Sequence, residues 1–117
     1  MERLPFNIND NCKLMKRGLN MYIDKSTERV RSEKYYSVGY NPKIKKYLLA
    51  DVVTWIAWYE RYFEISEDEY EMFGSDELDS MAEGFHKEGT ASTRFLFSIK
   101  NEENTSWQLE MRDRAKI

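Results

Sequence analysis

The run from Trp55 to Ile65, WIAWYERYFEI, limits the possible folds of this chain more than any other stretch. It holds two tryptophans, two tyrosines, a phenylalanine and two isoleucines, with no glycine or proline. Read with a period of two, one face is apolar except for Arg61 and the other is mixed. This is typical of a central strand with one face on the core and the other partly covered. A helix is the alternative, because the apolar residues also form a stripe at helical spacing. Aromatic and β-branched residues favour the strand, as does the helix-start signal that follows at Ser66.

Other segments with strand-like alternation or composition are predicted to complete a sheet of about five strands. They are Tyr36–Tyr40, Tyr47–Val53, Thr93–Ile99 and Ser106–Met111. The Asn41-Pro42 pair between the first two is a turn signal, because proline fixes φ and asparagine tolerates turn geometry. These two segments are therefore predicted to form a hairpin.

Two helices are predicted between the central run and the Thr93–Ile99 strand. Ser66 and Glu69 have the spacing of a capping box, and Gly74 is a plausible stop for the first helix. Ser75 then caps a second helix, whose end is bracketed by two glycines. The apolar face of this second helix is formed by Leu78, Met81, Ala82 and Phe85.

The chain is short enough for a single domain, residues 1–117. We expect residues 1–33 to be an N-terminal arm with a possible helix, and residues 34–117 to be a sheet-and-helix core. The helix would follow the caps at Asn9–Asn11. The stretch from Lys25 to Ser32 is polar and is predicted as a loop. One face of the possible helix would be formed by Cys12, Met15, Leu19 and Tyr22.

Composition excludes several classes of protein. The net charge of −3 does not predict bulk affinity for nucleic acid or for an anionic membrane. A single cysteine, Cys12, excludes an internal disulfide framework and fits a reducing compartment. There is no apolar run near the length of a membrane span, and the first residues lack the order of a signal peptide. We therefore expect a cytosolic protein with no membrane partner.

Charge is unevenly spread along the chain. Residues 1–46 are basic and residues 47–117 are acidic. Between Glu64 and Glu83 there are nine carboxylates and no lysine or arginine. One interpretation is two solvated helix faces. The other is a surface for an electropositive partner, because like charges at this density repel one another and a basic surface would relieve the repulsion while speeding association.

The sequence contains no motif typical of a catalytic, metal or cofactor site. Cys12 and His86 are candidates for a thiolate–imidazole pair, but neither stands in a recognisable motif, and a buried cysteine and a surface histidine are the simpler interpretation. One cysteine and one histidine do not favour a zinc site, and no EF-hand spacing or phosphate loop occurs. Stacking of single-stranded bases on the aromatic residues would need a basic groove, whereas the neighbours of the aromatic run are acidic. We expect no catalytic residue, metal ligand or cofactor.

The segments KYYSVGY, KKYLLADVV, WYERYFEISEDEYEMF, DELDSMAEGF and RFLFS resemble small bacterial immunity proteins encoded beside polymorphic toxins, including those of contact-dependent growth inhibition systems. The resemblance covers residues 34–98 and includes a strand that passes directly into an acidic helix. It implies a protein that is not an enzyme and that binds a cognate toxin domain in the cytosol. Toxins of this kind are often basic nucleases.

The combined prediction is an α+β domain, an antiparallel sheet of about five strands with two to three helices packed on it. Its predicted function is to neutralise a toxin effector through an acidic surface. The alternatives are a regulatory inhibitor or nucleic-acid mimic that acts on a DNA-binding protein, and a small hydrolase that uses carboxylates or the Cys12–His86 pair. The predicted partner-binding residues are the carboxylates Glu67, Asp68, Glu71, Asp76, Glu77 and Asp79, with Trp58 or Tyr62, if exposed, as an aromatic anchor.

Overall fold

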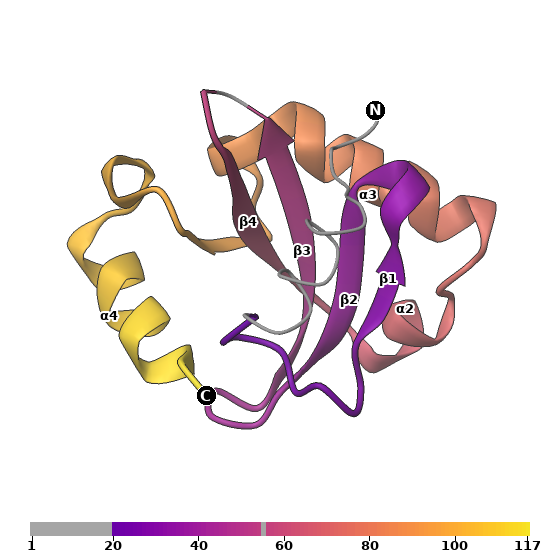
Figure 1. Cartoon of the computed structure of the whole chain (residues 1–117), viewed down its shortest axis with the longest axis horizontal. Helices are drawn as coiled ribbons and strands as arrows, with labels where there is room; N and C mark the ends of the chain where they lie inside the picture. Colours follow the sequence, from indigo (N-terminus) through magenta and orange to yellow (C-terminus); the bar gives the residue numbers. More distant parts are fainter. Residues whose placement is uncertain (1–19, 55) are drawn as a thin grey trace.

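The computed structural model describes residues 20–54 and 56–117, and its centre is a five-stranded antiparallel sheet (Figure 1). The strands stand in the sheet in the same order as in the chain. They are β1 Arg29–Arg31, β2 Tyr36–Asn41, β3 Lys46–Thr54, β4 Trp58–Ile65 and β5 Phe95–Ser98. The helices that the described residues form on this sheet are α2 Glu67–Glu71, α3 Asp76–Glu88 and α4 Ser106–Ala115, with single 3-10 turns η1 Ser32–Lys34, η2 Gly89–Ala91 and η3 Asn101–Glu103. The predicted α+β class is confirmed.

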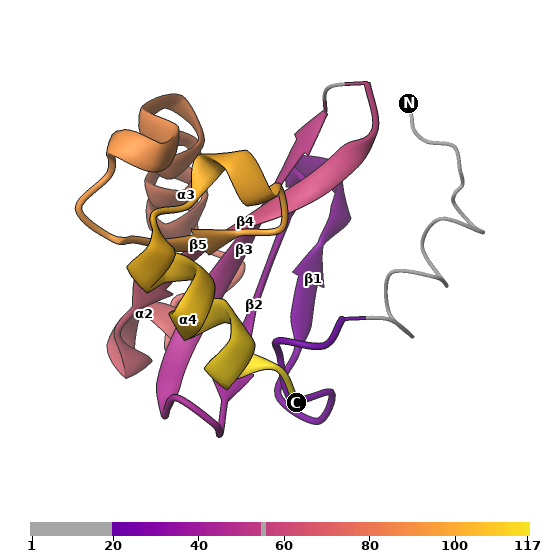
Figure 2. The ribbon, with the colours of Figure 1, turned by 90° about the vertical axis from the view of Figure 1, so that its left-hand side faces the viewer.

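The sheet lies between two helical layers (Figure 2). Helices α2 and α3 cover one face, and α4 covers part of the other. Successive side chains of a strand point to opposite faces, so β3 and β4 supply alternate residues to two separate cores. The predicted strand Trp55–Ile65 is confirmed from Trp58 onward, whereas Ile56 and Ala57 lie in the turn that precedes it and Trp55 lies outside the described residues.

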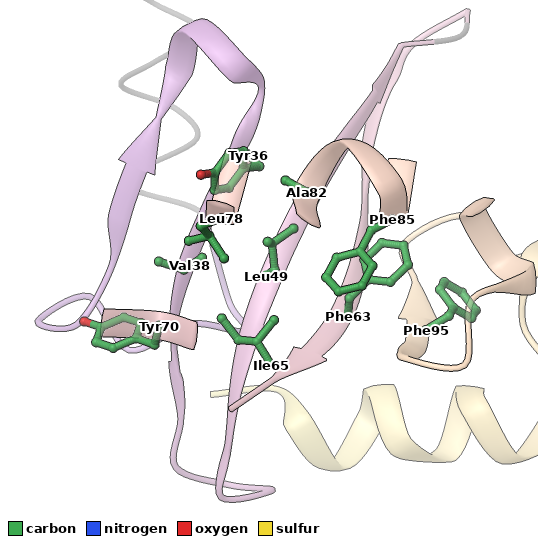
Figure 3. Close-up of a cluster of buried hydrophobic side chains, with 10 residues drawn as sticks. All are labelled: Tyr36, Val38, Leu49, Phe63, Ile65, Tyr70, Leu78, Ala82, Phe85 and Phe95. Atoms are coloured by element: carbon green, nitrogen blue, oxygen red, sulfur yellow. The ribbon is translucent and has the colours of Figure 1, made fainter. Parts of the chain in front are cut away.

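The core beneath α2 and α3 is built around Leu49 of β3, which lies opposite Val38 on β2 and Phe63 on β4 (Figure 3). All three side chains are fully buried. The apolar stripe of α3 packs on them as the sequence predicts, with Leu78, Ala82 and Phe85 buried and Met81 partly buried. This packing fixes where the outer face of α3 stands relative to the sheet.

The second core lies on the opposite face of the same strands. Leu48 and Ala50 of β3 and Tyr62 of β4 contribute to it, and Tyr62 stacks on Phe97 of β5 with ring centroids 5.0 Å apart. Helix α4 supplies Met111 and Ala115, and the segment before β1 supplies Tyr22 and Ile23. The face of β4 that the sequence predicts as mixed and partly covered is therefore buried at Tyr62.

Asn41, at the end of β2, connects three distant parts of the chain and is fully buried. Its side-chain amide donates to the carbonyls of Tyr22 and Ala115, both at 2.8 Å. Its side-chain oxygen accepts from the N–H groups of Lys43 and Ile44 in the β2–β3 turn. The predicted Asn41-Pro42 turn is thus also the point where both ends of the described chain are held together.

The predicted strand at Ser106–Met111 is wrong, because these residues belong to helix α4. Thr105 accepts from the N–H of Gln108, and the Gln108 side chain accepts from the N–H of Thr105, which is a complete capping box. A short apolar–polar alternation in this segment resembles a strand pattern. The capping box formed by Thr105 and Gln108, three residues apart, indicates a helix instead.

The fifth strand is instead β1, within the stretch Lys25–Ser32 that is predicted as a loop. It pairs with β2 through Arg29–Val38, Val30–Ser37 and Arg31–Tyr36. The strand is short and carries two arginines, as suits an edge strand, so it shows no buried face in the sequence. Because β1, Tyr22 and Ile23 are part of the fold, the sheet-and-helix core begins before residue 34.

The predicted caps at Asn9–Asn11 and most of the possible N-terminal helix, including Cys12, lie outside the described residues. Tyr22, its last predicted position, is in a bend. A search of the residues that the structure describes finds no helix with the length and apolar character needed to cross a membrane.

Candidate partner-binding surface

Helix α2 begins with the predicted capping box, and Glu69 has two roles in it. Its carboxylate accepts from the N–H of Ser66 at 2.7 Å, while the Ser66 hydroxyl accepts from the N–H of Glu69. The same carboxylate accepts hydrogen bonds from both terminal nitrogens of Arg94, each at 2.9 Å. The hydrogen bonds from Arg94 hold the pKa of Glu69 at about 2. Arg94, next to β5, therefore ties the start of the acidic segment to the sheet.

Helix α3 begins at the Ser75 cap, whose hydroxyl accepts from the N–H of Leu78. The acidic residues of its first turn include Asp76 and Glu77, both exposed. Negative side chains are stabilised by the positive end of the helix dipole, so these carboxylates fit the helix without needing a cation beside them.

Five of the nine carboxylates between Glu64 and Glu83 are paired with bases from other parts of the chain. The pairs are Lys46–Glu64 at 3.2 Å, Arg94–Glu69 at 2.9 Å, Arg29–Glu71 at 3.7 Å, Arg31–Asp79 at 2.8 Å and Lys87–Glu83 at 3.8 Å. The sequence shows an uninterrupted acidic run because these bases lie on β1, β3, α3 and beside β5. Part of the expected self-repulsion is therefore relieved inside the molecule.

Asp79 is the most firmly held of the predicted contact residues. Arg31 donates to both of its oxygens, at 3.2 and 2.8 Å, and the Tyr36 hydroxyl donates to it at 2.6 Å. The hydrogen bond from Arg31 is the main cause that lowers the pKa of Asp79. This carboxylate joins α3 to β1 and β2, so its role is first of all structural.

Four carboxylates differ from these. In the part of the chain that the structure describes, they make no ion pair and accept no side-chain hydrogen bond, and all four are exposed. They are Glu67, Asp68, Asp76 and Glu77. Of the six predicted contact carboxylates, these four are available to a partner, while Glu71 and Asp79 already have internal cations.

A cleft of about 610 Å³ lies beside α3, between this helix and the segment that joins β1 to β2. The floor includes Asp51 and Val52 of β3. Its lining is mainly acidic and aromatic, and includes Tyr35, Tyr36, Asp51, Asp76, Glu83 and His86. Asp76 therefore belongs both to the unpaired carboxylates and to the wall of this cleft.

Asp51 and His86 form a pair in the cleft. Nδ1 of His86 lies 2.9 and 3.1 Å from the two carboxylate oxygens of Asp51. The Asp51 side chain is 5% exposed and that of His86 is 52% exposed. Burial raises the pKa of Asp51, an effect that His86 opposes. The sequence gives no sign of this pair, because Asp51 stands inside a strand and has no local motif.

The two aromatic anchor candidates differ in exposure. Tyr62 is 1% exposed within the second core, so it is not available to a partner. Trp58 is 42% exposed and meets Tyr35 edge-on, with ring centroids 6.1 Å apart. Because Tyr35 lines the cleft, Trp58 stands next to it. Ile56 in the preceding turn is 91% exposed, and sequence reasoning did not single it out.

The alternative pairing of His86 with Cys12 cannot be located, since Cys12 lies outside the described residues, whereas His86 is held by Asp51. Among the described residues, no three His, Cys, Asp or Glu side chains are grouped closely enough to hold a metal ion.

In comparisons with known proteins, no family model, no curated protein and no solved structure matches this chain.

Proposed function

We propose that this chain is an immunity protein, which acts in the cytosol by binding and neutralising a cognate toxin domain with a basic surface. The observation that carries the proposal is the set of four carboxylates, Glu67, Asp68, Asp76 and Glu77. They are exposed in the first turns of two consecutive helices, and within the described residues no cation neutralises them. The proposal is of a binding protein without a catalytic step.

The arrangement suits recognition of a basic protein because of how the charge is distributed. The bases that pair with the acidic segment are already engaged with Glu64, Glu69, Glu71, Asp79 and Glu83. The negative field of the four remaining carboxylates is therefore directed to solvent. Such a field steers an oppositely charged partner and raises its association rate.

A partly exposed aromatic pair stands beside the cleft that Asp76 lines, at the end of β4 away from α2. Partly exposed tryptophan and tyrosine side chains are frequent hot spots of interfaces, and Trp58 and Tyr35 contact each other at the cleft. Trp107 on α4 is more exposed, at 59%. It belongs to a different layer of the molecule and so supplies a matched control.

The test is stopped-flow binding to the protein domain encoded beside this gene, with protection of cells that express that domain. Asp68, Asp76 and Glu77 are changed together to lysine, because none of them has an ion-pair partner in the part of the chain that the structure describes. We expect slower association and loss of protection. In the parent, the association rate should fall between about 0.01 M and 0.1 M salt, as the Debye length shortens from about 30 Å to about 10 Å.

The control carries the same change of charge away from this surface, at Glu102, Glu110 and Asp113, which are also exposed. It should associate and protect almost as the parent does. Trp58→Ala should weaken binding, and Trp107→Ala should not. Equal behaviour of the two triple variants would show that the carboxylates of α2 and α3 are only a solvated surface.

A further inference from the structure

We infer that the cleft beside α3 receives an arginine side chain of the partner protein, an inference that rests on the proposed function and deepens it. The cleft has a volume of about 610 Å³, which is ample for one guanidinium and its methylene stem. Asp76, one of the four carboxylates assigned to the partner, is among its lining residues. The inference depends on three separate properties of the cleft: its charge, its buried carboxylate and its aromatic wall.

The first property is an excess of negative charge. Five carboxylates and one lysine line the cleft. Three of the five have cations nearby, since Arg31 lies within 4 Å of Glu33 and Asp79, and Lys87 within 4 Å of Glu83. The other two are Asp51 and Asp76. Neither makes an ion pair with a lysine or arginine among the described residues, although Arg61, opposite Asp51 on β4, is close enough to lower the pKa of Asp51.

The second property is the hydrogen bonding of Asp51. An ionised carboxylate has about four acceptor positions, yet in the described structure both oxygens of Asp51 share a single donor, Nδ1 of His86. This carboxylate is 5% exposed, and a buried carboxylate with so few donors is costly. Since it lines the cleft, a cationic donor placed there would supply the missing hydrogen bonds.

The third property concerns the choice of arginine. A guanidinium presents several N–H groups in one plane, which match carboxylate oxygens in pairs, and its face stacks on aromatic rings. Tyr35 lines the cleft and is 41% exposed, whereas Tyr36, which also lines it, is 2% exposed and donates its hydroxyl to Asp79. Nδ1 of His86 lies against Asp51, and Nε2 makes no hydrogen bond within the described residues. A guanidinium seated in the cleft would thus meet the acceptor oxygens of Asp51, whereas Asp76 stands ten residues before His86 on α3, about 15 Å along the helix axis, and would act on it only by longer-range attraction.

The direct test uses a probe that does not depend on the identity of the toxin. Amide resonances of the full chain are followed by NMR during titration with L-argininamide, and in parallel with L-citrullinamide, which has a similar shape and no guanidinium charge. We expect saturable shifts at Tyr36, Asp51, Ser80 and His86 with argininamide only. Equal shifts with both probes, or shifts spread evenly over the acidic helices, would overturn the inference.

Two variants assign the binding to the cleft. Asp76→Asn is at an exposed position and should weaken argininamide binding by roughly two- to fivefold, as expected for a solvated charge pair. Asp51→Asn should weaken it by about tenfold or more, because a hydrogen bond to a charged group is lost from a buried site. Glu67→Gln, an unpaired carboxylate outside the cleft, should leave it unchanged. Thermal melts confirm that each variant is folded, and unchanged affinity in folded Asp76→Asn and Asp51→Asn would refute the cleft site.

Kinetics with the toxin domain separate this inference from the proposed function. A side chain seated in the cleft should make Asp51→Asn, at a buried position, raise the dissociation rate with little change in association, whereas Asp76→Asn, at an exposed position, should also slow association. If the toxin binds and neither variant changes its dissociation, the cleft inference fails while the proposed function stands. If argininamide binds in the cleft and the toxin does not bind at all, the proposed function fails, and with it the assignment of the arginine to that partner.

Discussion

Phe63 of β4 and Phe85 of α3 lie face to face, with ring centroids 4.8 Å apart and ring planes 3° from parallel. Phe95 of β5 closes the group and meets Phe63 edge-on at 5.7 Å. The stack joins the helix that carries His86 and Asp76 to the sheet that carries Asp51. The geometry of the candidate site therefore depends on an aromatic contact beneath it.

Replacing Phe63 by alanine should lower the free energy of unfolding by about 3–5 kcal/mol, because the side chain is fully buried and its loss leaves a cavity beside Phe85. Chemical denaturation followed by circular dichroism measures the change. Val30→Ala on the edge strand, where the side chain is 44% exposed, should change stability by about 0.5 kcal/mol or less. Similar denaturation midpoints for the two variants would contradict the described core.

Stability should fall as the pH is lowered from about 5 towards 2. The pKa values of Glu69 and Glu103 are each held at about 2, chiefly by hydrogen bonds from Arg94 and Arg61 respectively. In the unfolded chain a glutamate titrates near about 4.3. A carboxyl whose pKa is lower in the folded state stabilises that state above its unfolded pKa, and loses this contribution as the pH falls through the folded pKa. Asp51, whose pKa is raised by burial, contributes in the opposite direction.

The variant Glu69→Gln separates the charge from the cap, because glutamine also serves in a capping box. It should flatten the acid limb of the stability profile, measured as urea midpoints between pH 6 and pH 2.5. Glu102→Gln, at an exposed neighbour of Glu103, should leave the profile unchanged. An acid limb that Glu69→Gln does not alter would rule out the contribution assigned to its pairing with Arg94.

Thr105→Ala should destabilise the protein by about 0.5–2 kcal/mol, since it removes the hydroxyl that caps α4. Ser106→Ala, one position later and also exposed, lacks this role and should have little effect. Thermal unfolding of the two variants compares them directly. Because α4 covers part of the second core through Met111 and Ala115, this comparison also tests that residues 106–115 are a helix rather than a strand.

Asn41→Asp should be among the more damaging single substitutions in the turn regions. It removes the two N–H donors to the carbonyls of Tyr22 and Ala115, and it places a charge at a fully buried site. We expect a loss of several kcal/mol, on the scale of breaking a buried polar network. Hydrogen exchange should show the ends of the described chain opening first. Asn101→Asp, at an exposed position, is the matched control.

The sequence predicts the β2–β3 hairpin, β4, β5 and the helices α2 and α3, because each of these has a strong local signal. Leu78, Ala82 and Phe85 repeat at helical spacing, and Ser66 and Ser75 mark where helices begin. Local signals fail for β1 and α4. β1 is a polar edge strand that pairs on one side, and the capping pair Thr105 and Gln108 is masked by a short alternation of apolar residues.

Less of the candidate site than of the fold can be predicted from the sequence. The acidic run is visible in the chain, but the cations that pair with half of it come from segments as distant as Arg29 and Arg94. Asp51 and His86 are 35 positions apart. They meet only because α3 returns across β3, so no spacing rule could have joined them. Tyr62 and Trp58 lie on the same face of β4, and only the position of α4 and β5 decides which is buried.

Residues 66–94 connect two strands that lie side by side and antiparallel in the sheet, β4 and β5. Two neighbouring antiparallel strands can be joined by a short turn. Helices α2 and α3 are therefore an insertion in the connection between β4 and β5. The inner stripe of this insertion is fixed by the core, whereas its outer positions take no part in strand pairing. Under the proposed function, recognition and folding would therefore be separable: the outward-facing residues of the insertion could be exchanged to suit a different partner while the strand register is kept.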